Sequence, residues 1–334
     1  MKNQIKCRTR RMRNTLLLAG LMALGNAHAS EELAKVTFGL DWFAKAEHGG
    51  FFQAVATGIY EKHGLDVTIE AGGPQVNGMQ LLLAGKLDFV MGYPIHNINA
   101  VEQGLPVVSV AATFQKDPQV IIMQPGIKSL SELKGGSILV ANYADTTFWP
   151  WLKKEYGFTD DMKAPFTGSL QPFLSERADA QQGYLTNEPY TIGRAGVDAN
   201  VILMADEGYP PYAGVIETTR EMLNEKPEVV QQFIKASLEG WRSYFKNPKP
   251  GNELIQKSNP ELTPELIAYS IGKMKEYNLI DGGAAQDGGI GTMTHERWEE
   301  TFDFMVDTGL VNTGVDYRKA YSLEFLPESP IFLE

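Results

Sequence analysis

The sequence predicts an α/β protein built as two lobes that the chain connects twice. Strand and helix patterns alternate through its first third, which indicates a mostly parallel sheet with helices on both faces. Two segments that contain Pro and Gly, at 113–128 and 208–212, interrupt this alternation. A chain of about 300 residues also usually divides into two lobes.

The first lobe begins with regular alternation. Strands are expected at 36–40, 66–70, 87–91 and 107–112, and helices at 50–62, 77–84 and 97–103. In the helix at 50–62, apolar residues fall near one face, and His63-Gly64 provides a stop signal. These elements follow one another in the order that parallel strands with crossover helices require.

A second α/β unit follows 113–128, which we interpret as a crossing between lobes. Further strands are expected at 137–141, 181–186 and 201–204, and a helix at 148–156. The chain returns through 208–212 into a mostly helical last third, in which the glycine-rich segment 281–291 is expected to be a loop. We therefore assign residues 30–117 and 214–334 to a discontinuous first lobe and residues 118–213 to the second.

The first 29 residues have the order of a cleavable secretory leader. A basic start precedes a short apolar run at 16–24, and Ala27-His28-Ala29 provides a small-x-small cleavage pattern. The apolar run is too short to span the ~30 Å core of a membrane. The single cysteine, Cys7, lies in this leader, so the exported chain is expected to contain no disulfide and no cysteine nucleophile.

Charge and motif searches disfavour several classes of function. The chain has a net charge of −11, and the leader holds six of its basic residues, whereas nucleic-acid binding needs a basic face. The sequence contains no nucleophile elbow, phosphate-binding loop or zinc-protease helix. The four histidines beyond the leader are scattered, without the spacing of a metal site. We predict no catalytic residue, no metal and no cofactor.

Aromatic and polar side chains concentrate where the expected strands end. Parallel α/β sheets bind ligands beyond the carboxyl ends of their strands. Trp and Tyr provide flat faces for stacking a ring, and amide or carboxylate groups bind its polar edge. The segments concerned are 41–43, 48–50, 93–96, 113–115, 142–149 and 184–190. They predict a small-molecule site between the lobes.

Six short motifs resemble the branch of periplasmic binding proteins that binds pyrimidine precursors of thiamine, a branch related to the sulfonate, taurine and nitrate receptors. The resemblance extends over roughly residues 35 to 325. The motifs are Leu40-Asp41-Trp42-Phe43, Glu47-His48-Gly49-Gly50-Phe51, Gly64-Leu65-Asp66-Val67, Gly85-Lys86-Leu87-Asp88-Phe89, Ser131-Glu132-Leu133-Lys134-Gly135 and Gly208-Tyr209-Pro210-Pro211-Tyr212.

This resemblance implies the type II periplasmic fold, in which two α/β lobes are joined by two hinge crossings. It implies a receptor that delivers a small heterocycle, in this branch a thiamine-precursor-like aminopyrimidine, to an ABC importer. The permease and ATPase of that importer are then its partners. Together with the leader, the resemblance implies a monomer located in the periplasm.

The same resemblance implies roles for individual residues. In that branch a Trp after the first strand and an aromatic residue from a facing loop sandwich the pyrimidine, and an acidic residue of the second lobe binds its amino group. The corresponding positions are Trp42, Tyr93 and Glu188. A carboxylate accepts hydrogen bonds from an exocyclic amine, which agrees with this role for Glu188. The further residues expected to line the cleft are His48, Asp41, Phe114, Asn142 and Tyr209.

The chain departs from that branch at 44–47, where Ala-Lys-Ala-Glu stands in place of the usual Pro-Asn before the histidine. The ligand class therefore stays open, and a receptor for a sulfonate, taurine or nitrate is the alternative. Asp145-Thr146-Thr147, before a predicted helix, offers donors to an anion, but nearby acidic residues and the net charge disfavour one. A secreted enzyme is less favoured, because the related eukaryotic pyrimidine synthases carry a cysteine-rich motif that is absent here.

Overall fold

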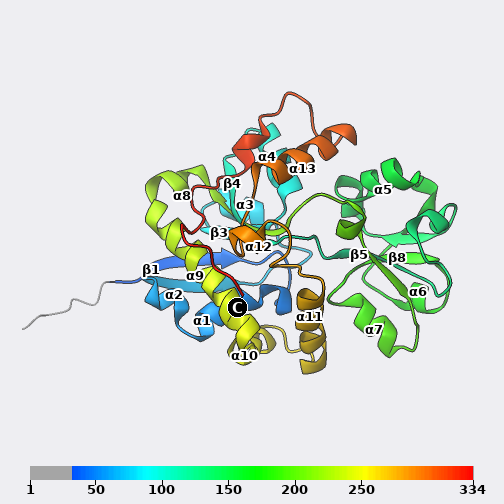
Figure 1. The fold of residues 1–334 in the computed structure, drawn as a ribbon, viewed down its shortest axis with the longest axis horizontal. Coiled ribbons are helices and arrows are strands. Elements are labelled where there is room, and N and C mark those ends of the chain that lie inside the picture. The colour runs from blue at the N-terminus through cyan, green and yellow to red at the C-terminus, as the bar shows by residue number, and fades with distance from the viewer. Residues whose placement is uncertain (1–31, 334) are drawn as a thin grey trace, which may run out of the picture. The chain divides into compact units, whose positions relative to one another are not determined.

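The computed structural model describes residues 32–333 (Figure 1). The chain divides into a short unit, residues 1–32, and a large unit, residues 33–334, in which all the elements given below lie. The predicted leader at 1–29 falls outside the described residues. Within the described range, no helix is both long enough and apolar enough to cross a membrane.

The first sheet has the strand order β2-β1-β3-β10-β4. Its strands are β1 (Ala34–Gly39), β2 (Leu65–Glu70), β3 (Phe89–Gly92), β4 (Val107–Phe114) and β10 (Ala213–Thr219). Strand β1 runs parallel to β2 and β3, whereas β10 is antiparallel to both β3 and β4. A strand from late in the chain therefore lies between two early ones.

The second sheet has the order β7-β6-β8-β5-β9 and repeats this plan. Its strands are β5 (Gln119–Met123), β6 (Ile138–Val140), β7 (Lys163–Pro165), β8 (Ala180–Tyr184) and β9 (Asn200–Leu203). Strand β6 is parallel to β7 and β8, and β5 is antiparallel to β8 and β9. The chain passes from β4 to β5 and back from β9 to β10, so the prediction of two α/β lobes joined by two crossings is confirmed.

Helices cover both sheets, and we call each sheet with its helices a lobe. Those of the first lobe are α1 (Gly49–Ala56), α2 (Ile59–Lys62), α3 (Gly78–Leu83), α4 (Pro94–Glu102), α8 (Arg220–Glu225), α9 (Pro227–Lys246), α10 (Lys249–Ser258), α11 (Pro264–Glu276), α12 (Ala285–Gly288) and α13 (His295–Asp307). Those of the second are α5 (Trp149–Tyr156), α6 (Gln171–Leu174) and α7 (Glu188–Arg194). Short 3-10 turns include η1 (Ala46–His48), η2 (Leu130–Leu133), η3 (Asn142–Thr146), η4 (Asp160–Met162), η5 (Met204–Glu207) and η6 (Tyr317–Ala320).

Two expectations about helices differ from the structure. The single helix expected at 50–62 is two helices, α1 and α2, because Gly58 adopts a left-handed conformation with φ of 66°. The segment 281–291 is not entirely loop, since it contains the short helix α12. Periodicity alone detects neither change, because both depend on single backbone positions.

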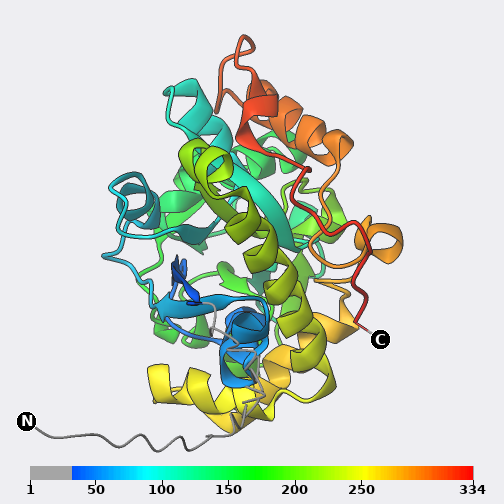
Figure 2. The same cartoon turned by 90° about the vertical axis from the view of Figure 1, so that its left-hand side faces the viewer.

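Aromatic rings and a close helix contact hold the first lobe together. The ring of Phe233 on α9 stacks on Phe89 at 4.2 Å, and Phe38 lies 4.6 Å from Phe51. Figure 2 shows the long helix α9, in yellow-green, beside α1, in blue. The two helices touch backbone to backbone, because a Cβ atom on Gly240 of α9 would lie 2.2 Å from the carbonyl oxygen of Gly50.

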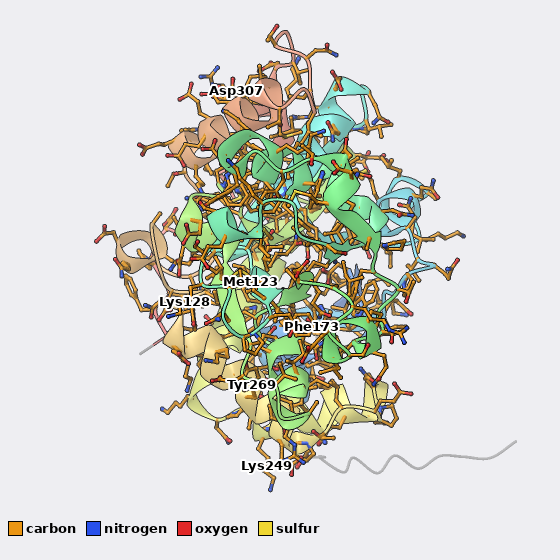
Figure 3. All side chains as sticks on the ribbon, turned by 90° about the vertical axis from the view of Figure 1, so that its right-hand side faces the viewer. Met123, Lys128, Phe173, Lys249, Tyr269 and Asp307 are labelled. Carbon is orange, nitrogen blue, oxygen red and sulfur yellow. The ribbon has the colours of Figure 1, made fainter. Side chains whose placement is uncertain are left out.

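The second lobe has a smaller core. Phe173 of α6 is fully buried, and Figure 3 labels its position in this lobe. Tyr269 of α11, also labelled in Figure 3, packs against Tyr190 of α7 with ring centres 5.1 Å apart. A helix of the first lobe thus contacts a helix of the second.

The close contact between α1 and α9 predicts the effect of adding one methyl group. Gly240→Ala should lower the free energy of unfolding by about 2 kcal/mol or more, because the backbone of Gly50 has no free space to move into. Gly272→Ala is the matched control, since no atom lies within 4 Å of its Cβ position on α11. The control should raise stability by up to about 1 kcal/mol through helix propensity. Urea unfolding measures both, and equal stabilisation by the two variants would contradict the close contact.

Candidate functional site

The ends of strands from both sheets meet in a set of hydrogen bonds centred on Asp41. The Tyr93 hydroxyl, after β3, donates to Asp41 Oδ2 at 3.3 Å, and the hydroxyl of Tyr184, at the end of β8, lies 2.5 Å from that of Tyr93. Because the hydrogen of Tyr93 is directed to Asp41, Tyr184 donates to Tyr93. A chain of hydrogen bonds therefore joins the two lobes and ends on Asp41.

His48 binds the other oxygen of Asp41. Its Nε2 lies 2.9 Å from Asp41 Oδ1, and its Nδ1 accepts the backbone N–H of Lys45 at 3.2 Å. Since Nδ1 accepts, the ring hydrogen resides on Nε2 and is donated to Asp41. His48 is nearly fully buried, so its role in this geometry is to orient Asp41 from behind.

Glu47 makes a second contact between the lobes. The Thr186 hydroxyl, after β8, donates to Glu47 Oε1, and the backbone carbonyl of Thr186 accepts the hydroxyl of Ser270 on α11. The other oxygen of Glu47, Oε2, is buried without a hydrogen-bond partner among the described residues. The departure at 44–47 thus places a carboxylate where the lobes meet.

Asp117 lies on the first crossing, between β4 and β5. It is 2% exposed, and its Oδ1 accepts the backbone N–H of Gln119 at 2.9 Å. Burial raises the pKa of Asp117 to about 7; the bonds from Gln119 oppose this shift, and the charge of Asp41 adds to it. Asp117 therefore titrates near neutral pH at a hinge position.

Glu217 lies on β10 beside the end of β3. It is 1% exposed, and its Oε1 is buried without a hydrogen-bond partner among the described residues. A Cβ atom on Gly92 would lie 2.0 Å from this oxygen, so the glycine leaves the space that the carboxyl group occupies. Burial raises the pKa of Glu217 to about 8, against a hydrogen bond from the Tyr93 backbone and together with the charge of Asp41.

We call Asp41, Asp117 and Glu217 the carboxyl cluster. Among residues 32–333, no lysine or arginine comes within 4.0 Å of any of the three carboxylates, and the ion-pair partner of Asp41 is His48. Buried carboxylates normally have a cationic partner or a full set of donors. In the carboxyl cluster, Asp41 and Asp117 have hydrogen-bond donors on both oxygens, whereas Oε1 of Glu217 has none among the described residues.

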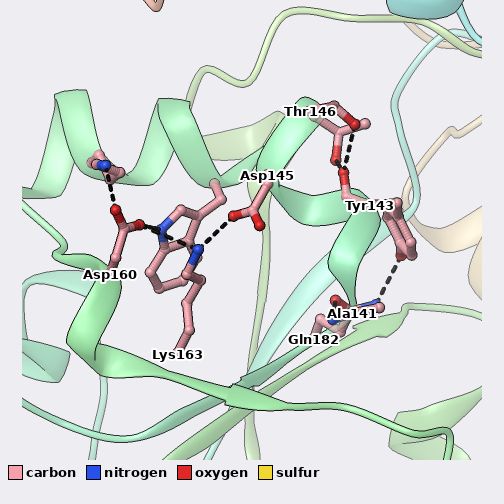
Figure 4. A network of polar contacts seen from close by, with 10 residues as sticks. Ala141, Tyr143, Asp145, Thr146, Asp160, Lys163 and Gln182 are labelled. Atoms are coloured by element: carbon pink, nitrogen blue, oxygen red, sulfur yellow. Dashed lines mark hydrogen bonds and ion pairs between the residues drawn. The ribbon is translucent and has the colours of Figure 1, made fainter.

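Exposed aromatic rings accompany this cluster. Trp42 is 41% and Phe43 is 49% exposed, and their rings meet edge to face at 5.7 Å. In the second lobe Tyr143, on η3, is 45% exposed and accepts a hydrogen bond of 2.8 Å from Gln182 (Figure 4). Exposed aromatic side chains at strand ends provide flat faces for a planar ligand.

The acidic residue expected in the second lobe, Glu188, already has two donors. Its Oε2 accepts the backbone N–H of Tyr184 at 2.6 Å, and its Oε1 accepts the side chain of Asn187 at 2.7 Å. Glu188 is also the first residue of α7, where a negative charge is favoured by the helix dipole. These contacts give Glu188 a structural task next to Tyr184.

The remaining residues expected to line the cleft lie in different environments. Phe114 is buried in the first lobe, with its ring 6.1 Å from Trp241. Tyr209 is buried between Trp151 and Phe304, at 5.5 and 5.6 Å. Asn142 is exposed at the start of η3. The geometry therefore unites Asp41, Tyr93 and His48, and leaves these three outside that hydrogen-bonded set.

The segment considered for an anion is occupied by internal bonds. The hydroxyls of Thr146 and Thr147 donate to the carbonyl of Tyr143, and Asp145 pairs with Lys163 at 2.6 Å (Figure 4). A surface hollow there contains Lys153, whose ammonium group pairs with Asp160 at 3.0 Å. These lysines are thus neutralised by their neighbours.

Sequence reasoning missed Asp117, Glu217, Tyr143 and Tyr184 as individual candidates. Asp117 stood out as part of an Asp-Pro breaker, and the two tyrosines lay inside segments that were considered as wholes. For Glu217 the available signal was a charged residue directly after the apolar run 213–216. Among residues 32–333, no group of three His, Cys, Asp or Glu side chains is arranged to hold a metal ion.

Removal of the Glu217 charge should stabilise the protein at alkaline pH. The folded state holds a proton on this carboxyl up to about pH 8, whereas the unfolded chain releases it near pH 4.5, so stability falls as pH rises through this window. Glu217→Gln should remove that loss and raise the free energy of unfolding at pH 9 by about 2 kcal/mol, with little change at pH 4. Urea unfolding at both pH values measures the difference, and a pH-independent loss of stability would contradict the assignment.

The chain is similar in sequence to two proteins named as binding proteins and in fold to a third. The chain is 24% identical over 310 residues to riboflavin-binding protein RibY of Chloroflexus aurantiacus, which covers 90% of this chain and 88% of the relative. It is 24% identical over 306 residues to the formylaminopyrimidine-binding protein of Halalkalibacterium halodurans, with 84% and 87% covered. The periplasmic aliphatic sulphonate binding protein SsuA of Escherichia coli superposes with a TM-score of 0.67 at 16% identity, over 90% of this chain and 94% of SsuA.

These similarities confirm the type II periplasmic fold expected from the sequence. Another relative carries an enzyme's name: the 4-amino-5-hydroxymethyl-2-methylpyrimidine phosphate synthase THI11 of Saccharomyces cerevisiae is 25% identical over 252 residues, with 67% of this chain and 74% of the enzyme covered. A family model described as NMT1/THI5 like matches residues 45–250, more than half of the chain, and the chain therefore belongs to that family.

Proposed function

We propose that this protein is a periplasmic receptor that binds a small heterocycle, a thiamine-precursor-like aminopyrimidine, and delivers it to an ABC importer. The fold and the two relatives named as binding proteins support a receptor. The leader expected at 1–29 supports export. The partners in this proposal are the permease and ATPase of the importer, and the receptor acts as a monomer.

The observation that carries the ligand class is the combination of exposed aromatic rings with carboxyl groups that have no lysine or arginine partner among the described residues. Trp42 offers a face for a planar ring, and Asp41 beside it in sequence offers an acceptor for an amino group. A sulfonate or nitrate needs donors, whereas the carboxyl cluster presents acceptor oxygens and the carboxylate of Asp41. The same observation therefore favours an amine-bearing heterocycle over the anion alternative.

We assign the binding lobes as in the sequence, residues 30–117 with 214–334 and residues 118–213. In this proposal the cleft closes by rotation at the two crossings. Contacts such as Tyr93 with Tyr184 join the lobes when they are close together. The closed form is then the one that the permease recognises.

We propose further that the receptor does not transform its ligand. The type II fold alone does not decide this point, because one fold supports binding and catalysis. The carboxyl cluster contains no nucleophile with an activating base beside it, and the described histidine in the network, His48, is nearly buried and orients Asp41.

Removal of the Trp42 ring should weaken binding. With 4-amino-5-hydroxymethyl-2-methylpyrimidine as the probe, Trp42→Ala should raise Kd about 10- to 100-fold, because stacking contributes about 1–3 kcal/mol. Trp42→Phe, which keeps a smaller aromatic ring, should raise Kd less than Trp42→Ala does. Isothermal titration calorimetry measures Kd, and the matched control is Phe332→Ala, another exposed aromatic residue that lies outside the network.

Thermal unfolding of the protein with and without each ligand separates the ligand classes. An aminopyrimidine should also raise Tm, because it binds the folded state. A clear rise with methanesulfonate or nitrate, combined with no response to any pyrimidine, would overturn the ligand assignment and leave the receptor.

A binding protein should return its ligand unchanged. After prolonged incubation of the purified protein with the same pyrimidine at equal concentrations, mass spectrometry of the extracted small molecules should recover only the starting compound. A new product that accumulates beyond one equivalent per protein would show turnover and would contradict a receptor role. Heat-denatured protein is the control for spontaneous decay.

A further inference from the structure

We propose that the ligand carries a positively charged nitrogen atom outside its aromatic ring, and that Asp41 binds this nitrogen. This inference rests on the proposed function and narrows its ligand class. It selects, among heterocycles, those with an aminoalkyl arm that is protonated at neutral pH.

Asp41 is the accessible member of the carboxyl cluster. Its side chain is 22% exposed, whereas Asp117 and Glu217 are 2% and 1% exposed as residues. One of its oxygens is firmly held by His48 at 2.9 Å, but Oδ2 has only a long contact of 3.3 Å with the Tyr93 hydroxyl. A hydroxyl–oxygen bond normally measures 2.5–3.0 Å, so Oδ2 retains capacity for a stronger donor.

Glu217 is the independent sign that a cation belongs here. Its buried Oε1 has no hydrogen-bond partner among the described residues. The carboxyl group fills space that exists because residue 92 is glycine, and it lies near enough to Asp41 for the two charges to interact. A buried carboxyl oxygen without a donor lowers stability, and a ligand cation near Asp41 would favour the charged form of Glu217.

The groups that face Asp117 provide no positive charge either. They are the amide of Gln119, the carboxylate of Asp41, and the phenols of Tyr93, Tyr143, Tyr184 and Tyr209. Burial raises the pKa of each of these four phenols, so they remain neutral at physiological pH. Glu217 is likewise faced by Asp41 and by the backbone N–H of Tyr93.

These surroundings favour an organic cation. Among residues 32–333, no three acidic or imidazole side chains converge as a metal ion would require. A single ammonium group, by contrast, needs one accessible carboxylate, which Asp41 provides. With Trp42 available for the ring, the ligand that fits both features is a planar heterocycle with a charged arm.

Two probes that differ in one group test this inference. They are 4-amino-5-aminomethyl-2-methylpyrimidine, which carries an ammonium group, and its hydroxymethyl counterpart, which is neutral at that position. Calorimetry at pH 7.5 and low salt should give a Kd at least about 10-fold lower for the aminomethyl compound, since charge-assisted hydrogen bonds are about twice as strong as neutral ones. Rising salt should reduce this preference.

Three variants locate the preference. Asp41→Asn retains an acceptor for His48 and should bring the two Kd values to within about threefold of each other. Glu217 does not touch the ligand in this proposal. Glu217→Gln should nevertheless reduce the preference for the aminomethyl compound while the protein remains folded. Asp66→Asn removes the same charge from the exposed face of β2 and should leave the preference unchanged.

The outcomes separate this inference from the proposed function. Equal affinity for the two pyrimidines, or tight binding of uncharged riboflavin with neither pyrimidine preferred, overturns the charged nitrogen. Binding of neither pyrimidine, with a response to methanesulfonate, overturns the proposed function itself. A preference that survives both Asp41→Asn and Glu217→Gln assigns the cation to another part of the site and contradicts the role of Asp41.

Discussion

The insertion of β10 between β3 and β4 is the constraint on which the rest of the structure depends. This strand enters the first sheet after the chain has built the second lobe, and it pairs with both neighbours in antiparallel register. The first sheet therefore cannot be completed until the chain has returned. The insertion places Glu217 beside Gly92, and thereby creates the most buried part of the carboxyl cluster. The crossing that leads out of the first lobe supplies Asp117, so that crossing and the returning strand β10 both contribute to the carboxyl cluster.

The carboxyl cluster opposes the stability of the fold that contains it. Burial raises the pKa values of Asp117 and Glu217, the charge of Asp41 adds to both shifts, and stability therefore falls as pH rises. Natural proteins retain such groups mainly where function requires them. Other contacts offset this loss of stability. They are the aromatic packing of Phe233 with Phe89 and Phe38, and the close contact of α1 with α9.

Much of the architecture was predictable because it depends on local patterns. Alternating apolar runs gave the strands and helices of the first lobe, and the breakers at Asp117-Pro118 and at 208–212 gave the two crossings. The division of the helix at Gly58 was not predictable, since periodicity continues across it.

For the site, Asp41, Tyr93 and His48 were found because they follow strands. Glu217 was not, because its position depends on which strands become neighbours, and that is a long-range property. Glu188 is the opposite case. As an acidic residue near a strand end it suits ligand binding, yet its two oxygens already accept hydrogen bonds from Tyr184 and Asn187.

The central claim is that the positive charge missing from the cluster comes with the ligand. With pKa values raised to about 7 and about 8, Asp117 and Glu217 are partly protonated near neutral pH, and an ammonium group at Asp41 would lower those pKa values and release protons. The most direct measurement is calorimetry of 4-amino-5-aminomethyl-2-methylpyrimidine binding at pH 7.5 in buffers of different ionisation enthalpy, which counts the protons exchanged. The account predicts net release of protons on binding, and a smaller release from Glu217→Gln. Binding with no proton exchange, or with proton uptake, would contradict it.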